Sequence, residues 1–192
     1  MGTKKRKSMT YNKSLRVNKT DKTITDKTIK GYKLKAIFLD RDGVINYNRN
    51  DYVKSWEEFK FIPGAKKAIK KINQTDKLLI IITNQSPIGR GILTHEKLDE
   101  LHDLMLSELS EAGCHIDAIY YCPHHPNDKC DCRKPKPGLI LSAAKDFNID
   151  LEASWMIGDS ESDLKAGKAV GCKTIKVTLK KPLIKIINEI LN

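Results

Sequence analysis

From Leu34 onward, short apolar runs alternate with longer segments in which apolar residues recur every three or four positions. A short apolar run is typical of a buried parallel strand, and the longer pattern is typical of an amphipathic helix. The predicted strands are Leu34–Leu39, Leu78–Thr83, Ile116–Cys122, Trp155–Gly158 and Thr174–Val177. Repeated strand–helix units predict an α/β fold with a parallel sheet that helices cover on both faces.

Proline, threonine and glycine mark the helix boundaries. We expect Pro63 and Pro137 in the first turns of two helices, because the fixed φ of proline suits that position. Thr94 can cap a third helix that ends at Gly113, and Gly171 ends a fourth. The apolar stripe of the third helix consists of Leu98, Leu101, Met105 and Leu109. The whole pattern predicts a Rossmann-like, doubly wound sheet whose ligands bind beyond the carboxyl ends of its strands.

Charge is distributed unevenly along the chain. Residues 1–33 contain nine Lys and two Arg against two Asp, a net charge of +9, which leaves +2 of the total +11 for residues 34–192. The first segment has almost no apolar pattern, so we predict a disordered basic tail over 1–33. With 192 residues and 40% hydrophobic content, the rest suits one domain, 34–192.

Targeting signals are not evident in the sequence. The basic run "KKRK" at Lys4–Lys7 is most simply a solvated charge cluster. The chain shows no apolar segment of the kind that signal peptides or membrane spans require. We therefore expect a cytoplasmic monomer without a membrane or nucleic-acid partner.

Polar residues that can carry chemistry follow four of the predicted strands. The first strand is followed by Asp40 and Asp42, and the second by "TNQS" from Thr83. The third is followed by "CPHHPNDKCDCRKP" from Cys122, and the fourth by "GDSESD" from Gly158. Because parallel strands place their carboxyl ends at one edge of the sheet, we expect these segments to form a single site.

The two aspartates after the first strand need a counter-charge. Side chains two positions apart on an extended chain point to the same side, so Asp40 and Asp42 should repel each other unless a cation binds there. The carboxylates of Asp40 and Asp159 suit Mg²⁺, which also binds phosphate oxygens. Asp40 can attack phosphorus to form an aspartyl-phosphate, while Asp42 serves as general acid and base. Fixed donors for the transferring phosphoryl group are Thr83, Asn84 and Lys134.

Three cysteines and two histidines crowd into the segment after the third strand. Cys122, Cys130 and Cys132 with His124 or His125 are typical of a four-ligand zinc site. A disulfide is the alternative, and the expected cytoplasmic location argues against it. The spacing alone leaves open which histidine is the fourth ligand.

These motifs resemble the haloacid dehalogenase superfamily of phosphohydrolases, from Leu34 to about Val177. Within it, "DRDGVIN", "TNQSPIGRG", "CPHHPNDKCDCRKPKPG" and "GDSESD" resemble the D-glycero-D-manno-heptose 1,7-bisphosphate 7-phosphatases. The resemblance implies a domain without a large cap, a zinc-stapled loop, and Mg²⁺ and Zn²⁺ as cofactors. It implies hydrolysis of the C7 phosphate of that sugar in the synthesis of nucleotide-activated heptose for lipopolysaccharide or other surface glycans.

The resemblance also implies roles for individual residues. Asp40 becomes the nucleophile and Asp42 the acid/base. Mg²⁺ is held by the Asp40 carboxylate, the Asp42 backbone carbonyl and Asp159, and Asp163 supports the site from outside the coordination sphere. Residues implied to hold the phosphoryl group or sugar phosphate are Thr83, Lys134, Asn84, Gln85, Ser86 and Arg133, with Asn48 to Tyr52 as a flap. The implied zinc ligands are Cys122, His124, Cys130 and Cys132, with His124 chosen by the family's Cys-x-His pattern.

The sequence also departs from the family pattern in three respects, and a second substrate is compatible with it. Pro87 stands where Gly is usual, Ser160 stands where Lys or Arg is common, and the basic tail has no counterpart. The related histidinol-phosphate phosphatases share the short zinc loop, so histidinol phosphate is the alternative substrate. The segments "IGRG" at Ile88–Gly91 and "KPG" at Lys136–Gly138 favour the heptose.

A zinc-bearing nucleic-acid-binding module, anchored by the basic tail, is an interpretation of a different class. It leaves the four strand-end motifs without a role. It also calls for stacking aromatic residues, which make up only 6% of this chain. Outside the motifs, we expect His95 and His102 on the surface.

Overall fold

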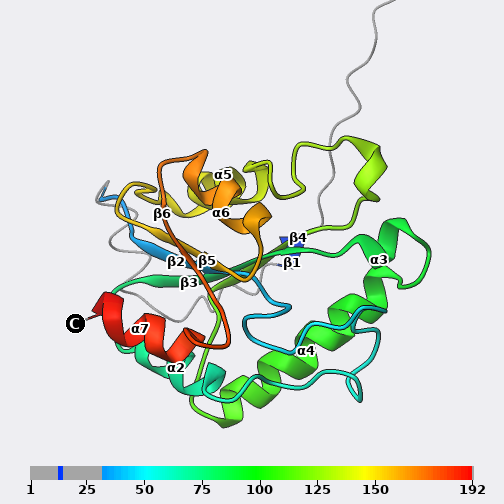
Figure 1. Cartoon of the computed structure of the whole chain (residues 1–192), viewed down its shortest axis with the longest axis horizontal. Helices are drawn as coiled ribbons and strands as arrows, with labels where there is room; N and C mark the ends of the chain where they lie inside the picture. The colour runs from blue at the N-terminus through cyan, green and yellow to red at the C-terminus, as the bar shows by residue number, and fades with distance from the viewer. Residues whose placement is uncertain (1–12, 15–31, 192) are drawn as a thin grey trace, which may run out of the picture.

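The computed structural model describes residues 13–14 and 32–191 (Figure 1). Most of the tail over 1–33 lies outside the described residues, so its predicted disorder stays a prediction. No helix in the described part of the chain combines the length and the apolar character that a membrane crossing requires.

Among the described residues, the centre of the fold is a six-stranded sheet with strand order β1-β4-β3-β2-β5-β6. The strands span Lys13–Ser14 (β1), Ala36–Leu39 (β2), Leu78–Asn84 (β3), Ala118–Cys122 (β4), Trp155–Gly158 (β5) and Lys173–Lys176 (β6). Strands β2 to β6 pair in parallel, which confirms the predicted sheet. The short β1, which the sequence did not predict, pairs antiparallel with β4 at the sheet edge.

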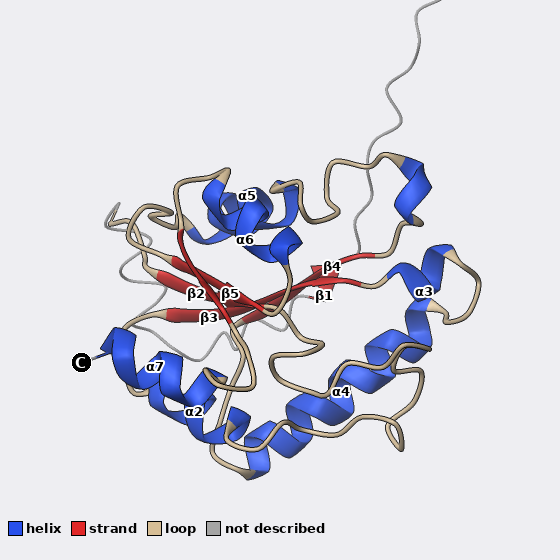
Figure 2. Ribbon diagram, viewed as in Figure 1, coloured by secondary structure: helices blue, strands red, loops and turns tan. Residues whose placement is uncertain are grey.

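Helices cover both faces of this sheet, as predicted (Figure 2). They span Ala65–Asn73 (α2), Ser86–Gly89 (α3), His95–Glu111 (α4), Gly138–Phe147 (α5), Glu161–Lys168 (α6) and Leu183–Leu191 (α7), with a short 3₁₀ helix at Pro126–Asp128 (η1). Helices α5 and α6 lie on one face, and α2, α4 and α7 lie on the other. The insert between β2 and α2 forms no named helix or strand within the described residues, so no large cap domain stands there.

The alternation of side chains along β3 explains why its sequence is apolar throughout. Leu79 and Ile81 pack into the cluster that contains residues of α2, α4 and α7. Ile80 and Ile82 pack into the cluster that contains residues of α5 and α6. Successive side chains point to opposite faces of a strand, and here both faces are buried under helices.

Helix boundaries agree with the sequence at α4 and differ at two prolines. Thr94 caps α4, and its side chain accepts a hydrogen bond from the amide of Lys97 at 3.3 Å. Pro63 precedes the N-cap residue Gly64 of α2, and Pro137 is itself the N-cap of α5. The prediction of first-turn positions for both prolines is therefore wrong by one or more residues, because the helices begin later than the prolines.

Candidate active site

The strand ends converge around a cavity of about 260 Å³, as the topology predicts. Asp40 follows β2, Thr83 and Asn84 end β3, and Asp159 follows β5. Predicted site residues that line the cavity are Asp40, Asp42, Asn48, Tyr52, Thr83, Asn84, Gln85, Ser86, Arg133, Lys134 and Asp159. Residues of the lining to which the sequence assigned no role include Arg41, Arg90 and Ser162.

Three carboxylates and one lysine form the charged centre of the site. Asp40, Asp159 and Asp163 each offer an oxygen, and these atoms lie within 4.8 Å of one another. The ammonium of Lys134 lies 3.0 Å from Asp40 Oδ1 and 2.6 Å from Asp163 Oδ1. A β-carbon at Gly43 would collide with the Asp159 carboxylate, so glycine lets the chain after β2 approach it. This donor set of hard oxygens fits Mg²⁺.

Asp163 is engaged by protein groups at both oxygens. Its Oδ2 accepts hydrogen bonds from the backbone amide of Ser160 at 3.0 Å and from the Ser160 hydroxyl at 2.7 Å. Ser160 is the N-cap residue of α6, and its contacts with Asp163 form a capping box. Its Oδ1 contacts Lys134. These contacts suit the predicted role of Asp163 as a support outside the coordination sphere.

The electrostatics of the centre follow from burial and from charge pairing. Burial raises the pKa of Asp40 to about 7, although the ammonium of Lys134 opposes the rise. Burial also raises the pKa of Asp159, and the Asp163 carboxylate adds to this effect. Burial alone would lower the pKa of Lys134, but Asp40 and Asp163 outweigh it and raise that pKa. Lys134 is therefore a buried cation, and added positive charge would favour ionised Asp40 and Asp159.

Asp42 lines the same cavity as Asp40, and its negative charge adds to the rise in the pKa of Asp40. The predicted convergence of the two carboxylates on one point stays a prediction. The carboxylate of Asp42 accepts hydrogen bonds from Arg41 and Gln85 at 2.9 Å and from Asn46 at 2.8 Å. Asp163, and not Asp42, completes the carboxylate group around Asp40.

These contacts decide the charge state of Asp42. Burial would raise its pKa, but the Arg41 guanidinium and the hydrogen bonds from Asn46 and Gln85 outweigh burial and hold the pKa below its ordinary value. Asp42 is accordingly a carboxylate in this arrangement. A bound phosphate dianion would raise its pKa by like-charge repulsion.

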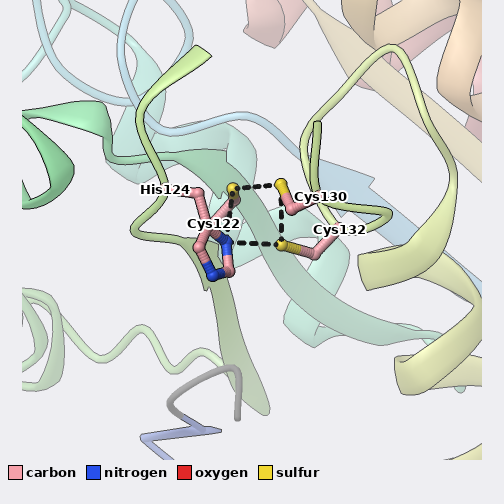
Figure 3. Close-up of side chains that lie close together, drawn as sticks. All are labelled: Cys122, His124, Cys130 and Cys132. Carbon is pink, nitrogen blue, oxygen red and sulfur yellow. Dashed lines mark hydrogen bonds between the residues drawn. The ribbon is translucent and has the colours of Figure 1, made fainter. Parts of the chain in front are cut away.

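The predicted zinc ligands lie together in one cluster, with their side chains turned toward one another (Figure 3). Cys122 Sγ is 3.6 Å from both Cys130 Sγ and His124 Nδ1. Cys132 Sγ is 3.4 Å from Cys130 Sγ and 3.1 Å from His124 Nδ1. Tetrahedral ligands of zinc stand roughly 3.3 to 3.8 Å apart, so three of these four distances fall in that range and the His124–Cys132 distance is slightly shorter, whereas disulfide sulfurs are about 2.05 Å apart. The cysteines are free, so the cluster fits a closed zinc site and not the disulfide alternative.

His125 is occupied elsewhere. Its Nδ1 accepts a hydrogen bond from the amide of Asn127 at 3.2 Å, and it caps η1. The geometry thus brings His124, and not His125, to the three cysteines.

The cysteine cluster is joined directly to the charged centre. Cys132 is followed by Arg133 and Lys134. The side-chain amide of Asn84 holds the backbone of Lys134 by two hydrogen bonds: its Oδ1 accepts from Lys134 N and its Nδ2 donates to Lys134 O, each at 3.1 Å. Asn84 is therefore placed to position Lys134, and it also lines the cavity, so its predicted contact with the substrate stays a prediction.

Two residues of the site environment were missed or misjudged from sequence. Arg41 is buried at 1% exposure and contacts Asp42, although charged residues rarely stand in such positions. His102 is also 1% exposed, so its predicted surface position is wrong, and His95 is only partly exposed. The spacing held a signal for His102, because it lies four positions after Leu98 and three before Met105 on the buried stripe of α4.

Comparison with known proteins agrees with this geometry. Residues 131–179 match a family model described as HAD-hydrolase-like. The chain is 43% identical over 156 residues to the D-glycero-beta-D-manno-heptose-1,7-bisphosphate 7-phosphatase of Pasteurella multocida, which covers 78% of this chain and 84% of that protein. It is 46% identical over 150 residues to the protein of the same name from Helicobacter pylori strain J99, covering 78% of this chain and 86% of the relative.

A solved structure shows the same likeness. The D,D-heptose 1.7-bisphosphate phosphatase from B. bronchiseptica, in complex with magnesium and phosphate, matches with a TM-score of 0.78 and 35% sequence identity. The match covers 82% of this chain and 98% of that chain.

Proposed function

We propose, from the premise that this chain belongs to the D-glycero-beta-D-manno-heptose-1,7-bisphosphate 7-phosphatase family of HAD-like hydrolases, that it removes the C7 phosphate of that sugar bisphosphate. The single observation that carries the proposal is the placement of Asp40. Its carboxylate contacts the Lys134 ammonium and lies with Asp159 and Asp163 in one group of carboxylates, at the wall of the cavity. Such a site suits phosphoryl transfer through a carboxylate nucleophile.

Asp40 is the proposed nucleophile. Its Oδ1 contacts Lys134 at 3.0 Å and accepts the backbone amide of Arg41 at 2.7 Å. Both neighbours bind the same oxygen, which leaves Oδ2 to attack phosphorus. The P–O bond to the sugar then breaks as an aspartyl-phosphate forms, and water later hydrolyses that intermediate.

Asp42 is the proposed acid and base of these two steps. It gives a proton to the leaving sugar oxygen in the first step and takes one from water in the second. The second step needs the carboxylate that Arg41 stabilises. The first needs the protonated form, which the negative charge of a bound phosphate favours.

Mg²⁺ and zinc would occupy different parts of the site. The Asp40 and Asp159 carboxylates, with the backbone carbonyl of Asp42, would hold Mg²⁺. When bound, Mg²⁺ supplies positive charge that neutralises phosphate oxygens and favours ionised Asp40. Zinc would be held by Cys122, His124, Cys130 and Cys132 as a structural ion without an open position.

The remaining cations of the cavity suit a second phosphate. Lys134 contacts Asp40, and Thr83 lines the same cavity, so the two would hold the transferring group. Arg90 and Arg133 also line the cavity, and Arg133 Nη1 is buried without a hydrogen-bond partner among the described residues. We assign these two arginines to the phosphate that stays on the sugar, because guanidinium groups bind phosphate oxygens in pairs. Asn48, Tyr52 and Ser86 would face the sugar.

Phosphate release from a substrate panel tests the proposal. The panel contains heptose 1,7-bisphosphate, histidinol phosphate and a generic phosphate ester, each with Mg²⁺ or with EDTA. We expect a kcat/KM for the bisphosphate roughly 100-fold or more above that for histidinol phosphate, since histidinol phosphate has no second phosphate to pair with Arg90 and Arg133. A preference for histidinol phosphate, or full activity in EDTA, would contradict the proposal. A monomeric state, a cytoplasmic location and the absence of a nucleic-acid partner stay predictions from sequence.

A further inference from the structure

A buried arginine stands between the two catalytic aspartates in sequence. Arg41 is 1% exposed, and its Nη2 lies 2.9 Å from both carboxylate oxygens of Asp42. Nη2 also lies 3.4 Å from Gln85 Oε1. A buried guanidinium needs partners for its N–H groups, because an unpaired buried charge is costly.

Helix α4 supplies the second anchor of this guanidinium. His102 Nε2 lies 3.1 Å from Arg41 Nη1, and both side chains are buried. Guanidinium groups only donate hydrogen bonds, so Nε2 must accept, and the ring is neutral with its proton on Nδ1. Burial and the positive charge of Arg41 lower the pKa of His102 to about 3, which is consistent with a neutral ring.

The contacts of Arg41 continue to the phosphate side of the site. Gln85 Nε2 donates to Asp42 Oδ2 at 2.9 Å and lies 3.0 Å from Thr83 Oγ1. The guanidinium is thus held at Nη1 by His102, and its Nη2 contacts Asp42 and Gln85. Two anchors fix the plane of a guanidinium, whereas one anchor leaves it free to rotate about that contact.

We propose that His102 is a positioning residue of the phosphatase: by accepting from Arg41 it fixes the guanidinium that holds Asp42 in place. This inference rests on the proposed function for its catalytic consequence, and on the Arg41–His102 contact alone for its structural part. Loss of His102 frees the Arg41 guanidinium and so misplaces Asp42. Because Asp42 transfers protons and does not bind the sugar, we expect kcat to fall and KM to stay nearly unchanged.

The chain offers a matched control. The rings of His95 and His102 both lie on α4, and each is 6.0 Å from the ring of Tyr121. His95 Nδ1 lies 3.0 Å from the Tyr121 hydroxyl, whereas His102 Nε2 meets Arg41. A change at His95 therefore disturbs the same packing without removing the acceptor of Arg41.

Three variants of the full chain separate hydrogen bonding from packing. His102→Phe keeps a ring against Tyr121 and removes the acceptor, His102→Gln keeps an acceptor without the ring, and His95→Phe is the control. Should His102→Phe fail to fold, His102→Leu takes its place. The first readout is kcat and KM for a generic phosphate ester with Mg²⁺. The second is the ¹⁵N NMR of the Arg41 guanidinium, assigned with Arg41→Lys, which does not depend on activity.

We expect His102→Phe to lose about tenfold in kcat with KM within about twofold, and His102→Gln to recover most of the loss. The Arg41 Nη protons should be resolved in the wild type, His95→Phe and His102→Gln, and averaged by rotation in His102→Phe. Full kcat in His102→Phe, no recovery in His102→Gln, or an equal loss in His95→Phe would overturn the inference. If the wild type turns over neither this ester nor heptose 1,7-bisphosphate, the proposed function fails, and the guanidinium signals alone decide the positioning role.

Discussion

Lys134 Nζ lies 3.0 Å from Asp40 Oδ1, although one residue comes from the loop of the cysteine cluster and the other follows β2. Lys134 also donates to the backbone carbonyl of Ile82 at 2.7 Å, which fixes its ammonium at the end of β3. The position of the loop therefore decides where the cation meets the nucleophile. This relationship would link the proposed zinc binding at the cysteines to the proposed nucleophile Asp40.

The first prediction concerns that link. Cys130→Ser should release zinc and lower kcat by roughly 10- to 100-fold, because Arg133 and Lys134 lose the anchor that precedes them. Dependence on Mg²⁺ should persist, since Asp40 and Asp159 are untouched. Metal analysis of the purified variant, run beside steady-state kinetics, checks both statements.

Cys114→Ser is the control for the cysteine change. Cys114 is buried outside the cluster, and its thiol contacts the backbone carbonyl of Lys66 at 3.4 Å, a contact that a hydroxyl can keep. This variant should retain zinc and activity. Full activity in a Cys130→Ser protein verified to be free of zinc would refute the coupling between the loop and the charged centre.

The second prediction concerns the covalent intermediate. Asp42→Asn should lower kcat by about 10²- to 10⁴-fold, because the amide can neither donate the proton to the sugar nor activate water. With a substrate whose leaving group departs unassisted, a phosphoenzyme should accumulate. Rapid quench with ³²P-labelled substrate and peptide mapping should place the label on Asp40, and Asp40→Asn should carry none. A label on another residue would exclude Asp40 as the nucleophile.

Much of this site was accessible from sequence because parallel strands bring their carboxyl ends together. That rule placed Asp40, Thr83 and Asp159 in one cavity without any knowledge of loops. Asp42 also lines this cavity. Its hydrogen bonds with Arg41 and Asn46 could not be predicted from strand alternation, because these residues lie beyond the end of β2 at Leu39.

The contact between Arg41 and His102 could not be predicted from local pattern. The two residues are 61 positions apart, and they meet only because α4 packs against the sheet beside the end of β2. Helical spacing could place His102 on the buried face of α4, but it could not predict that the imidazole contacts Arg41. The two hydrogen bonds between the Asn84 side chain and the Lys134 backbone also join residues far apart in sequence, so local pattern could not predict them.

The third prediction concerns the phosphate that stays on the sugar. Arg90→Gln should raise KM for heptose 1,7-bisphosphate by about tenfold, the usual effect of removing a charged hydrogen bond. Heptose 7-phosphate lacks the second phosphate, so its KM should not change. Parallel kinetics on the two substrates measure this difference directly. An equal rise for both substrates would show that Arg90 acts on the whole pocket instead of the second phosphate.

The fourth prediction concerns pH. Burial lowers the pKa of His102 to about 3 from its ordinary value of 6.5. Between these two pH values the His102 ring is protonated in the unfolded chain and neutral in the folded chain. The free energy of unfolding should therefore fall as pH drops across this window. His102→Gln lacks this group, and its stability should fall less steeply in urea titrations over the same range. Parallel curves for the two proteins would contradict a buried neutral His102.

The central claim is hydrolysis at C7 with Asp40 as nucleophile and the C1 phosphate left in place. It is tested most directly by following heptose 1,7-bisphosphate with ³¹P NMR in the presence of the wild-type chain and Mg²⁺. We expect the C7 phosphomonoester signal to disappear as inorganic phosphate grows, while the C1 signal persists, and we expect no change with Asp40→Asn. Loss of the C1 signal first, or an unchanged spectrum with active-site residues intact, would contradict the account.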